Sequence, residues 1–366
     1  MSLASSPTTT EATPARARGL GKTGVALGSL TALLGLVVMG SASLGAVRIG
    51  LGDVVLLLVR PLGLGTSHVI DAQAQAVFFA IRLPRIFLGA LVGATLSAAG
   101  AALQGLFRNP LAEPTLIGIS SGGSLAAVGA ILVAAKIGAL FPMLAVFWVP
   151  LASFGGSLFS TQVLVAAARL LGSTGPSSLL LIGVANNALF MAGTGLVMYA
   201  ANDAQLRSIT FWTLGSLGGA TWPLVAAMAP LALLSLAGLL WCAPGLNLLL
   251  LGEAEAGHSG LDVRALRLRV VVLVALGVGA SVAVSGMITF VGLVVPHLVR
   301  LALGPDHRRL MPATALLGAS LLCVADLVAR TVVSPSELPL GVVTALCGAP
   351  FFLWLLLREA RQRRLS

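Results

Sequence analysis

Residues 244–269 read PGLNLLLLGEAEAGHSGLDVRALRLR and form the longest charged interruption in a chain that is otherwise almost continuously apolar. Glu253 and Glu255 follow a run of four leucines, and a turn-forming segment comes next at 258–260. Asp262 then stands where it can cap a second short helix, which would carry Arg264, Arg267 and Arg269. We predict two short helices joined by a glycine turn on one membrane face. A solvated connecting loop is the alternative interpretation.

The composition indicates an integral membrane protein. Hydrophobic residues make up 57% of the 366 residues and charged residues only 9%, and the mean hydropathy is +1.02. A hydrocarbon core about 30 Å thick needs roughly 20 apolar residues in a helix, so this chain can hold about ten such helices. The net charge of +10 does not indicate nucleic-acid binding, because the basic residues stand singly at the ends of apolar runs, where they act as topology signals.

Apolar segments follow one another along the whole chain. They lie near residues 24–44, 84–106, 115–135, 141–168, 179–200, 223–243, 270–286, 288–303, 310–329 and 339–357. The predicted fold class is therefore an all-α polytopic membrane protein with about ten transmembrane helices. The segment 288–303 is short and contains Pro296, so we expect a helix that breaks or starts partway through the membrane around residues 285–292.

The distribution of arginine and lysine orients these segments. With a cytoplasmic N-terminus and strict alternation, seven of the 22 basic residues fall outside, namely Arg48, Arg60, Arg82, Arg85, Lys136, Arg207 and Arg330. All the others fall inside. The positive-inside rule favours this orientation, which places both termini and the loop 245–269 in the cytoplasm.

The N-terminal region differs from the rest. Residues 1–22 are rich in Ser, Thr, Pro and Ala, and we predict a disordered cytoplasmic tail before a membrane domain of residues 23–366. Residues 21–23 read GKT, but the first glycine of a nucleotide-binding loop is replaced by Arg16 and no strand precedes the motif. The sequence thus predicts no ATP site. The three cysteines fit no metal motif, which favours a packing role.

Two segments are similar to each other, VGATLSAAG at 92–100 and VGASVAVSG at 278–286. The same offset superposes Pro110 on Pro296. In the predicted topology the two copies cross the membrane in opposite directions. This is the pattern of an inverted repeat, which places a substrate path between two halves. Chance similarity between helices rich in small residues is the alternative.

Two stretches on the predicted outer side, 52–60 and 71–81, each begin with an aspartate that can cap a short interfacial helix. The second stretch leads into Arg82 and Arg85 at the outer mouth of the next segment. With Arg330, these two arginines would form a positive rim for an acidic partner.

Arg330 and Arg207 each have a simpler interpretation. Asp326 and Arg330 are four residues apart on one helix, which is the spacing of an internal ion pair. Arg207 lies in an external turn beside Trp212, where anchoring at the membrane interface is common.

Several motifs follow one another in a fixed order between residues 82 and 357. They are RLPR at 82–85, LQGLFRNPLAEP at 103–114, GISSGG at 118–123, GMITFVGLVVPHLVR at 286–300, ADLVAR at 325–330 and ELPLG at 337–341. No single motif would suffice, but their combined order resembles the permease subunit of the type II ABC importers for iron-siderophores, haem and cobalamin. Residues 203–219 are most similar to the haem branch.

The resemblance implies a homodimer of ten-helix subunits with the type II importer permease fold, a cytoplasmic ATPase in two copies and a periplasmic binding protein. The loop 245–269 then matches the helices that couple to the ATPase. Its contact residues would be Glu253, Glu255, Ser259, Leu261 and Asp262. Residues 254–257 depart from the bulkier, more acidic family pattern. Arg82, Arg85 and Arg330 match the external arginines that bind acidic residues of the binding protein.

The resemblance also implies haem as the cargo. Haem carries two propionates on a flat apolar ring, so we expect a cation near the outer entrance, for which Arg207 is the candidate. Candidates further along the path are Asn187, Met191 and Met198, although packing is the commoner role of such residues. The four histidines are dispersed, so we expect no permanently bound cofactor. Ferric siderophores and cobalamin are the alternative cargoes.

An ion-coupled secondary carrier is the rival class of function. It needs carboxylates within the bilayer, and only Asp326 and Glu337 approach that description. A membrane enzyme is disfavoured because no nucleophile–base or metal constellation is present in the sequence. We therefore expect a non-enzymatic transport subunit in the bacterial inner membrane. Its partners would be a second copy, the ATPase, a periplasmic haem-binding protein and membrane lipid, without nucleic acid.

Overall fold

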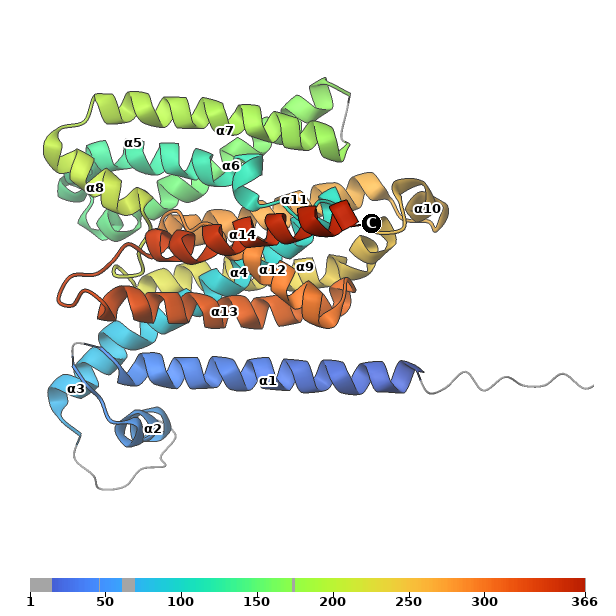
Figure 1. Ribbon diagram of the computed structural model, residues 1–366. Helices are drawn as coiled ribbons and strands as arrows, with labels where there is room; N and C mark the ends of the chain where they lie inside the picture. Colours follow the sequence, from blue (N-terminus) through green and yellow to red (C-terminus); the bar gives the residue numbers. More distant parts are fainter. Residues whose placement is uncertain (1–14, 46, 61–69, 173–174, 366) are drawn as a thin grey trace, which may run out of the picture.

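The computed structural model describes residues 15–45, 47–60, 70–172 and 175–365. Within them, 8 helices are long and apolar enough to cross a membrane, and two shorter apolar helices are Val291–Leu303 and Leu340–Leu355. The predicted all-α class is confirmed. Figure 1 shows the long helices running side by side as one bundle.

The first half of the chain contains α1 (Ala15–Ser43), α2 (Leu51–Val59), α3 (Ala72–Val77), α4 (Leu83–Phe107), α5 (Ile119–Leu140), α6 (Ala145–Leu170), α7 (Pro176–Tyr199) and α8 (Asp203–Thr213). The second half contains α9 (Trp222–Leu249), α10 (Glu253–His258), α11 (Val263–Ser285), α12 (Val291–Leu303), α13 (His307–Thr331) and α14 (Leu340–Leu365). A π-helical turn, Phe78–Arg82, joins α3 to α4.

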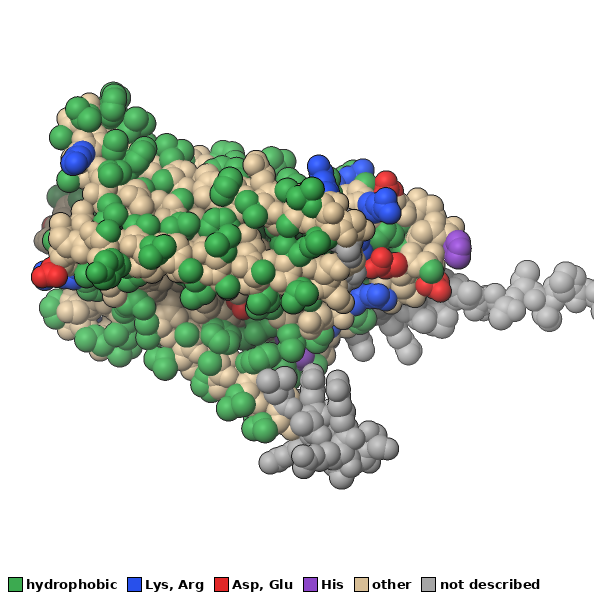
Figure 2. All heavy atoms as spheres, turned by 90° about the horizontal axis from the view of Figure 1, so that it is seen from above, with side chains coloured by type: hydrophobic (Ala, Val, Ile, Leu, Met, Phe, Trp, Pro, Cys, Tyr) green, Lys and Arg blue, Asp and Glu red, His purple; other side chains and the backbone are tan. Residues whose placement is uncertain are grey.

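The bundle has two distinct ends. The start of α1, helix α10 and the C-terminus share one end, which we call the α10 end (Figure 1). Helices α2, α3 and α8 lie at the opposite end, the α8 end. Apolar side chains cover the long face seen in Figure 2, while Lys, Arg, Asp and Glu gather towards the two ends. This distribution suits a protein whose long faces contact hydrocarbon.

Helix α4 lies at the centre of the bundle and is buried on nearly all sides. Close packing around it depends on small residues. A Cβ atom added at Gly93 would overlap the carbonyl of Gly318 on α13, and one added at Gly100 would overlap the carbonyl of Gly292 on α12. Gly105 likewise leaves room for the ring of His307. Membrane helices associate by such backbone-to-backbone packing, because apolar side chains gain little by leaving lipid.

The predicted helix break near residue 290 is present. Helix α11 ends at Ser285, and Gly286 and Phe290 both have a φ of 68°. The N–H of Phe290 donates to the Glu113 carboxylate at 2.9 Å, so a residue 177 positions away caps α12. Helix α12 has 13 residues. It is thus about 20 Å long, too short to cross a hydrocarbon core of about 30 Å.

The N-terminal region differs from prediction in two respects. Helix α1 begins at Ala15, so residues 15–22 are helical, while residues 1–14 lie outside the described part of the chain. Asp71 caps α3 by accepting the N–H of Ala74 at 3.2 Å, as predicted. Asp53, in contrast, lies in the first turn of α2, which Gly50 precedes as the N-cap residue.

The two similar segments lie in α4 and α11, which pack together and run in opposite directions. Their surroundings differ, because α4 continues to Phe107 whereas α11 ends at Ser285. Pro110 follows α4 and Pro296 lies inside α12.

Gly100→Ala is expected to lower the free energy of unfolding, because the added methyl meets backbone that cannot rotate away. Overpacking of this kind costs about 1–3 kcal/mol. The measurement is the thermal midpoint of the purified chain in detergent. Gly129→Ala is the control, since nothing lies within 4 Å of a Cβ added there. Equal midpoints for the two variants would contradict the packing argument.

Candidate functional site

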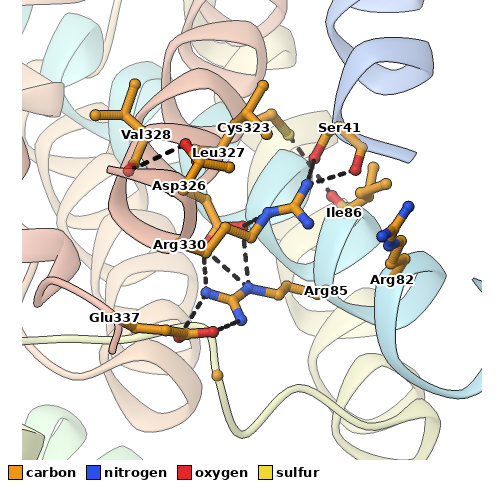
Figure 3. A network of polar contacts seen from close by, with 12 residues as sticks. Ser41, Arg82, Arg85, Ile86, Cys323, Asp326, Leu327, Val328, Arg330 and Glu337 are labelled. Atoms are coloured by element: carbon orange, nitrogen blue, oxygen red, sulfur yellow. Dashed lines mark hydrogen bonds and ion pairs between the residues drawn. The ribbon is translucent and has the colours of Figure 1, made fainter. Parts of the chain in front are cut away.

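A buried charge network lies at the α8 end, centred on Arg85 of α4. Its guanidinium donates to Asp326 of α13 at 2.9–3.0 Å and to both carboxylate oxygens of Glu337 at 2.8 and 2.9 Å. Figure 3 shows Arg85 reaching between the two carboxylates. Arg85 is 8% exposed and Asp326 3% exposed, so the pair is held away from water. A buried charge is tolerated when it is paired in this way.

Glu337 lies at the edge of this network, with a side chain 42% exposed. Hydrogen bonding to Arg85 lowers the pKa of Glu337 below its ordinary value. A carboxyl group with a lowered pKa stabilises the fold above its unfolded-state pKa, and that stabilisation is lost as the pH falls through the lowered value. The pair is therefore fully charged at neutral pH.

Two more arginines tie the end of α1 to the network. Arg82 donates to the carbonyls of Ala42, Ser43 and Val47. Arg330 donates to the carbonyl of Ser41 and, at 2.9 Å, to its hydroxyl. Carbonyls at a helix C-terminus lack partners within the helix, and here arginines from α4 and α13 supply them.

The three arginines therefore do not form the exposed rim that we expected. Arg82 is 4% exposed, and the side chain of Arg330 is 10% exposed and lies 3.8 Å from Asp326. The internal ion pair proposed for Arg330 is thus present, and Arg85 shares the same carboxylate. They border a cavity of about 260 Å³ at the α8 end. Docking by these residues stays a prediction, and reversing a charge here would disturb folding first.

The polar surface at the α10 end is built differently from our prediction. Helix α9 continues to Leu249 and α11 begins at Val263, so the connection contains one short helix, α10, instead of two. Arg264, Arg267 and Arg269 consequently lie on the first turns of α11 itself. The predicted cap is confirmed, because Asp262 accepts the N–H of Ala265 at 2.9 Å.

Internal bonds hold α10 in place. Glu253 pairs with the buried Arg267 at 2.8 Å, and the Ser259 hydroxyl donates to the carbonyl of Glu255 at 2.9 Å. Leu261 packs against the main core. The predicted contact residues thus gather on one projecting segment (Figure 1). Glu255 and Ser259 are exposed there, and Glu253 anchors the segment.

A polar clamp that the sequence did not predict joins α9 to α13 beside this segment. Asn247 donates to Asp306 at 2.6 Å and accepts the backbone N–H of His307 at 2.8 Å. Burial acts to raise the pKa of Asp306, but the bond from Asn247, the N–H of Arg308 and nearby arginines lower it overall. We interpreted Asn247 as a loop residue, whereas the signal for the clamp was an aspartate just before an apolar segment.

The predicted pathway residues lie on α7 and α8. Asn187, Met191 and Met198 are four and seven residues apart, so they share one face of α7. Met191 is 63% exposed in the single chain. Arg207 is exposed on α8 at the opposite end from α10, and Phe211 lies one turn further along. Asn186, in contrast, is buried and bonds to Ser160, which gives it a structural role.

Among the described residues, no group of three or more His, Cys, Asp or Glu side chains could hold a metal ion.

Comparison with known proteins identifies the family. Residues 33–358 match the FecCD transport family. The chain belongs to that family. It is 44% identical over 338 residues to the hemin transport system permease HmuU of Yersinia pestis, covering 92% of this chain and 96% of the relative. It is 42% identical over 293 residues to the cobalamin import permease BtuC of Halobacterium salinarum, covering 80% and 76%.

A solved FecCD-like structure supports the fold. It is an inward-facing conformation of a metal-chelate type ABC transporter, with a TM-score of 0.77 and 33% identity, and the match covers 91% of this chain and 98% of the other. The chain is therefore an ABC importer permease of the FecCD family and an integral membrane protein.

Asp326→Asn is expected to lower the free energy of unfolding by about 3–5 kcal/mol, the usual cost of breaking a buried ion pair. Glu337→Gln should cost clearly less, because that carboxylate is partly hydrated. Thermal midpoints in detergent compare the two variants, with Asp203→Asn, an exposed aspartate in the first turn of α8, as control. A loss for Asp326→Asn no greater than the control would show that the network does not stabilise the bundle.

Proposed function

We propose that this FecCD permease moves haem across the bacterial inner membrane. The observation that carries the proposal is the 44% identity to the hemin permease of Yersinia pestis over nearly the full length of both chains. The exposed Arg207 on α8 supports it, because an arginine beside Phe211 and Trp212 offers a cation and apolar faces together. Haem is the cargo in this proposal and is not a resident cofactor.

The proposed partners follow from the two ends of the bundle. The α10 end, with both termini, faces the cytoplasm and presents α10 to a separate ATPase subunit. The α8 end faces the periplasm and receives a haem-binding protein. Two copies of the chain enclose the pathway, and each copy pairs with one ATPase. The exposed α7 face that bears Met191 supports such pairing, because it offers an apolar surface for a second copy.

An ion-coupled carrier receives no support from the buried carboxylates. That mechanism needs an acidic group free to bind and release an ion. Both sequence candidates, Asp326 and Glu337, are bonded to Arg85. Glu113, a buried carboxylate that the sequence analysis missed, accepts the N–H of Phe290.

Cobalamin is the second candidate cargo. The cobalamin permease of Halobacterium salinarum is 42% identical, nearly as similar as the hemin permease, although over a smaller share of the chain. Ferric siderophores are a third candidate, because many are anionic and an arginine binds them as well as it binds a propionate.

The cargo test uses the complete complex of permease, ATPase and binding protein in liposomes. We expect ATP-dependent uptake of haem, and about tenfold slower uptake for Arg207→Ala, since a charge-assisted hydrogen bond contributes about 1.5–3 kcal/mol. Lys136→Ala is the matched control, an exposed cation near the same end of the bundle. Uptake of cobalamin or siderophore but not haem by the unmutated complex would overturn the cargo. An unchanged haem rate would remove the role of Arg207.

The coupling test replaces residues 253–261 with a flexible Gly/Ser linker. ATP-driven uptake should be abolished, because the linker cannot hold a rigid surface against the ATPase, while membrane insertion should persist. The single variant His258→Ala, an exposed position on the same helix, is expected to transport normally. Persistent uptake with the linker would identify the segment as a plain connector.

A further inference from the structure

A cavity of about 530 Å³ opens at the α10 end, between the C-terminus of α6 and the N-termini of α7 and α11. Binding sites for small molecules usually enclose about 300–1,000 Å³, so this space is large enough for a ligand. Its walls are mixed. Val165, Leu179 and Val271 supply apolar side chains, whereas Arg169 and Arg264 supply cations.

The two arginines differ from their neighbours in having no bond to the described residues. Arg267, also at the cavity, pairs with Glu253, and Arg269 lies over the ring of Trp241 at 5.6 Å. Arg169 and Arg264 are exposed, and no described residue forms an ion pair or hydrogen bond with either side chain. Asp262 also lines the cavity, but its carboxylate accepts the N–H of Ala265.

The position of the cavity selects the ligand. Its walls are the ends of three membrane-spanning helices, so it lies where the polar ends of the bundle meet the hydrocarbon-facing sides. The apolar residues lie further into the helices than the two arginines do: Val165 is one turn inside Arg169 on α6, and Val271 is two turns inside Arg264 on α11. A ligand that fits must carry negative charge at one end and hydrocarbon at the other.

We propose that this cavity binds an anionic phospholipid, with the headgroup phosphate between Arg169 and Arg264 and the acyl chains along Val165 and Val271. Basic pockets between membrane helices bind anionic lipid headgroups by the same chemistry. The lipid joins α6 to α11 beside α10. The proposal does not depend on which cargo the permease moves.

The test measures phospholipid binding to the full purified chain in detergent by native mass spectrometry. Phosphatidylglycerol and phosphatidylcholine with identical acyl chains are compared. We expect preferential binding of phosphatidylglycerol, and about thirtyfold weaker binding to Arg169→Gln/Arg264→Gln, corresponding to ~1 kcal/mol for each arginine near a lipid surface. The variant Arg169→Lys/Arg264→Lys keeps both charges and should retain the preference.

Arg269→Gln is the matched control, because it removes a cation from the same helix that already has an aromatic partner. It should leave the preference unchanged. If the double glutamine variant does not fold, each single variant is expected to lose about fivefold. Unaltered phosphatidylglycerol binding in the glutamine variants would overturn the proposal.

Two further outcomes would assign the cavity to another ligand and overturn the proposal. Displacement of bound phosphatidylglycerol by inorganic phosphate at equal concentration would indicate a site for a soluble anion. Normal lipid binding combined with loss of ATPase association in the glutamine variants would indicate a protein-docking surface.

Discussion

The bundle depends on how closely other helices can approach α4. Glycine at 93, 100 and 105 removes the side chains that would separate α4 from α13, α12 and His307. Within a membrane this constraint is strict, because packing contacts, and not release of water, hold helices together. The buried arginine network depends on the same approach, since Arg85 and its partner Asp326 belong to the two helices that pack through Gly93 and Gly318.

Polar groups are used differently at the two ends of the bundle. At the α8 end, charged side chains turn inward and satisfy one another or the carbonyls at the end of α1. At the α10 end, Glu253, Asp262 and Asn247 fix the backbone, while Glu255, Ser259 and neighbouring arginines stay exposed. Polar groups engaged internally make a surface rigid, and polar groups left exposed make it available to a partner.

The sequence predicted the features that depend on local composition. Apolar segments long enough to span a bilayer, the caps at Asp71 and Asp262, and the break near residue 290 all follow from short stretches of chain. The burial of Arg85 does not, because its partners are 241 and 252 residues away. A charged residue near the end of an apolar segment looks the same whether it faces water or another charge.

The start of the coupling segment was wrong for a related reason. Gly245 and Asn247 are typical of loops, yet α9 continues through both. Gly245 lies against Leu266 of α11, and Asn247 is engaged by Asp306 and His307, so tertiary contacts outweigh the weak local preference. Inspection of the sequence alone gives no sign of these partners.

The break between α11 and α12 has a consequence for biogenesis. A 13-residue helix is too short to partition into a bilayer by itself, and the peptide groups of residues 286–290 cannot face lipid unsatisfied. Helix α12 must therefore enter the membrane together with α11 as a hairpin. Its cap, Glu113, belongs to a part of the chain that is synthesised much earlier. The N-terminal half thus acts as a template, and the hairpin completes its hydrogen bonding only when it meets that half.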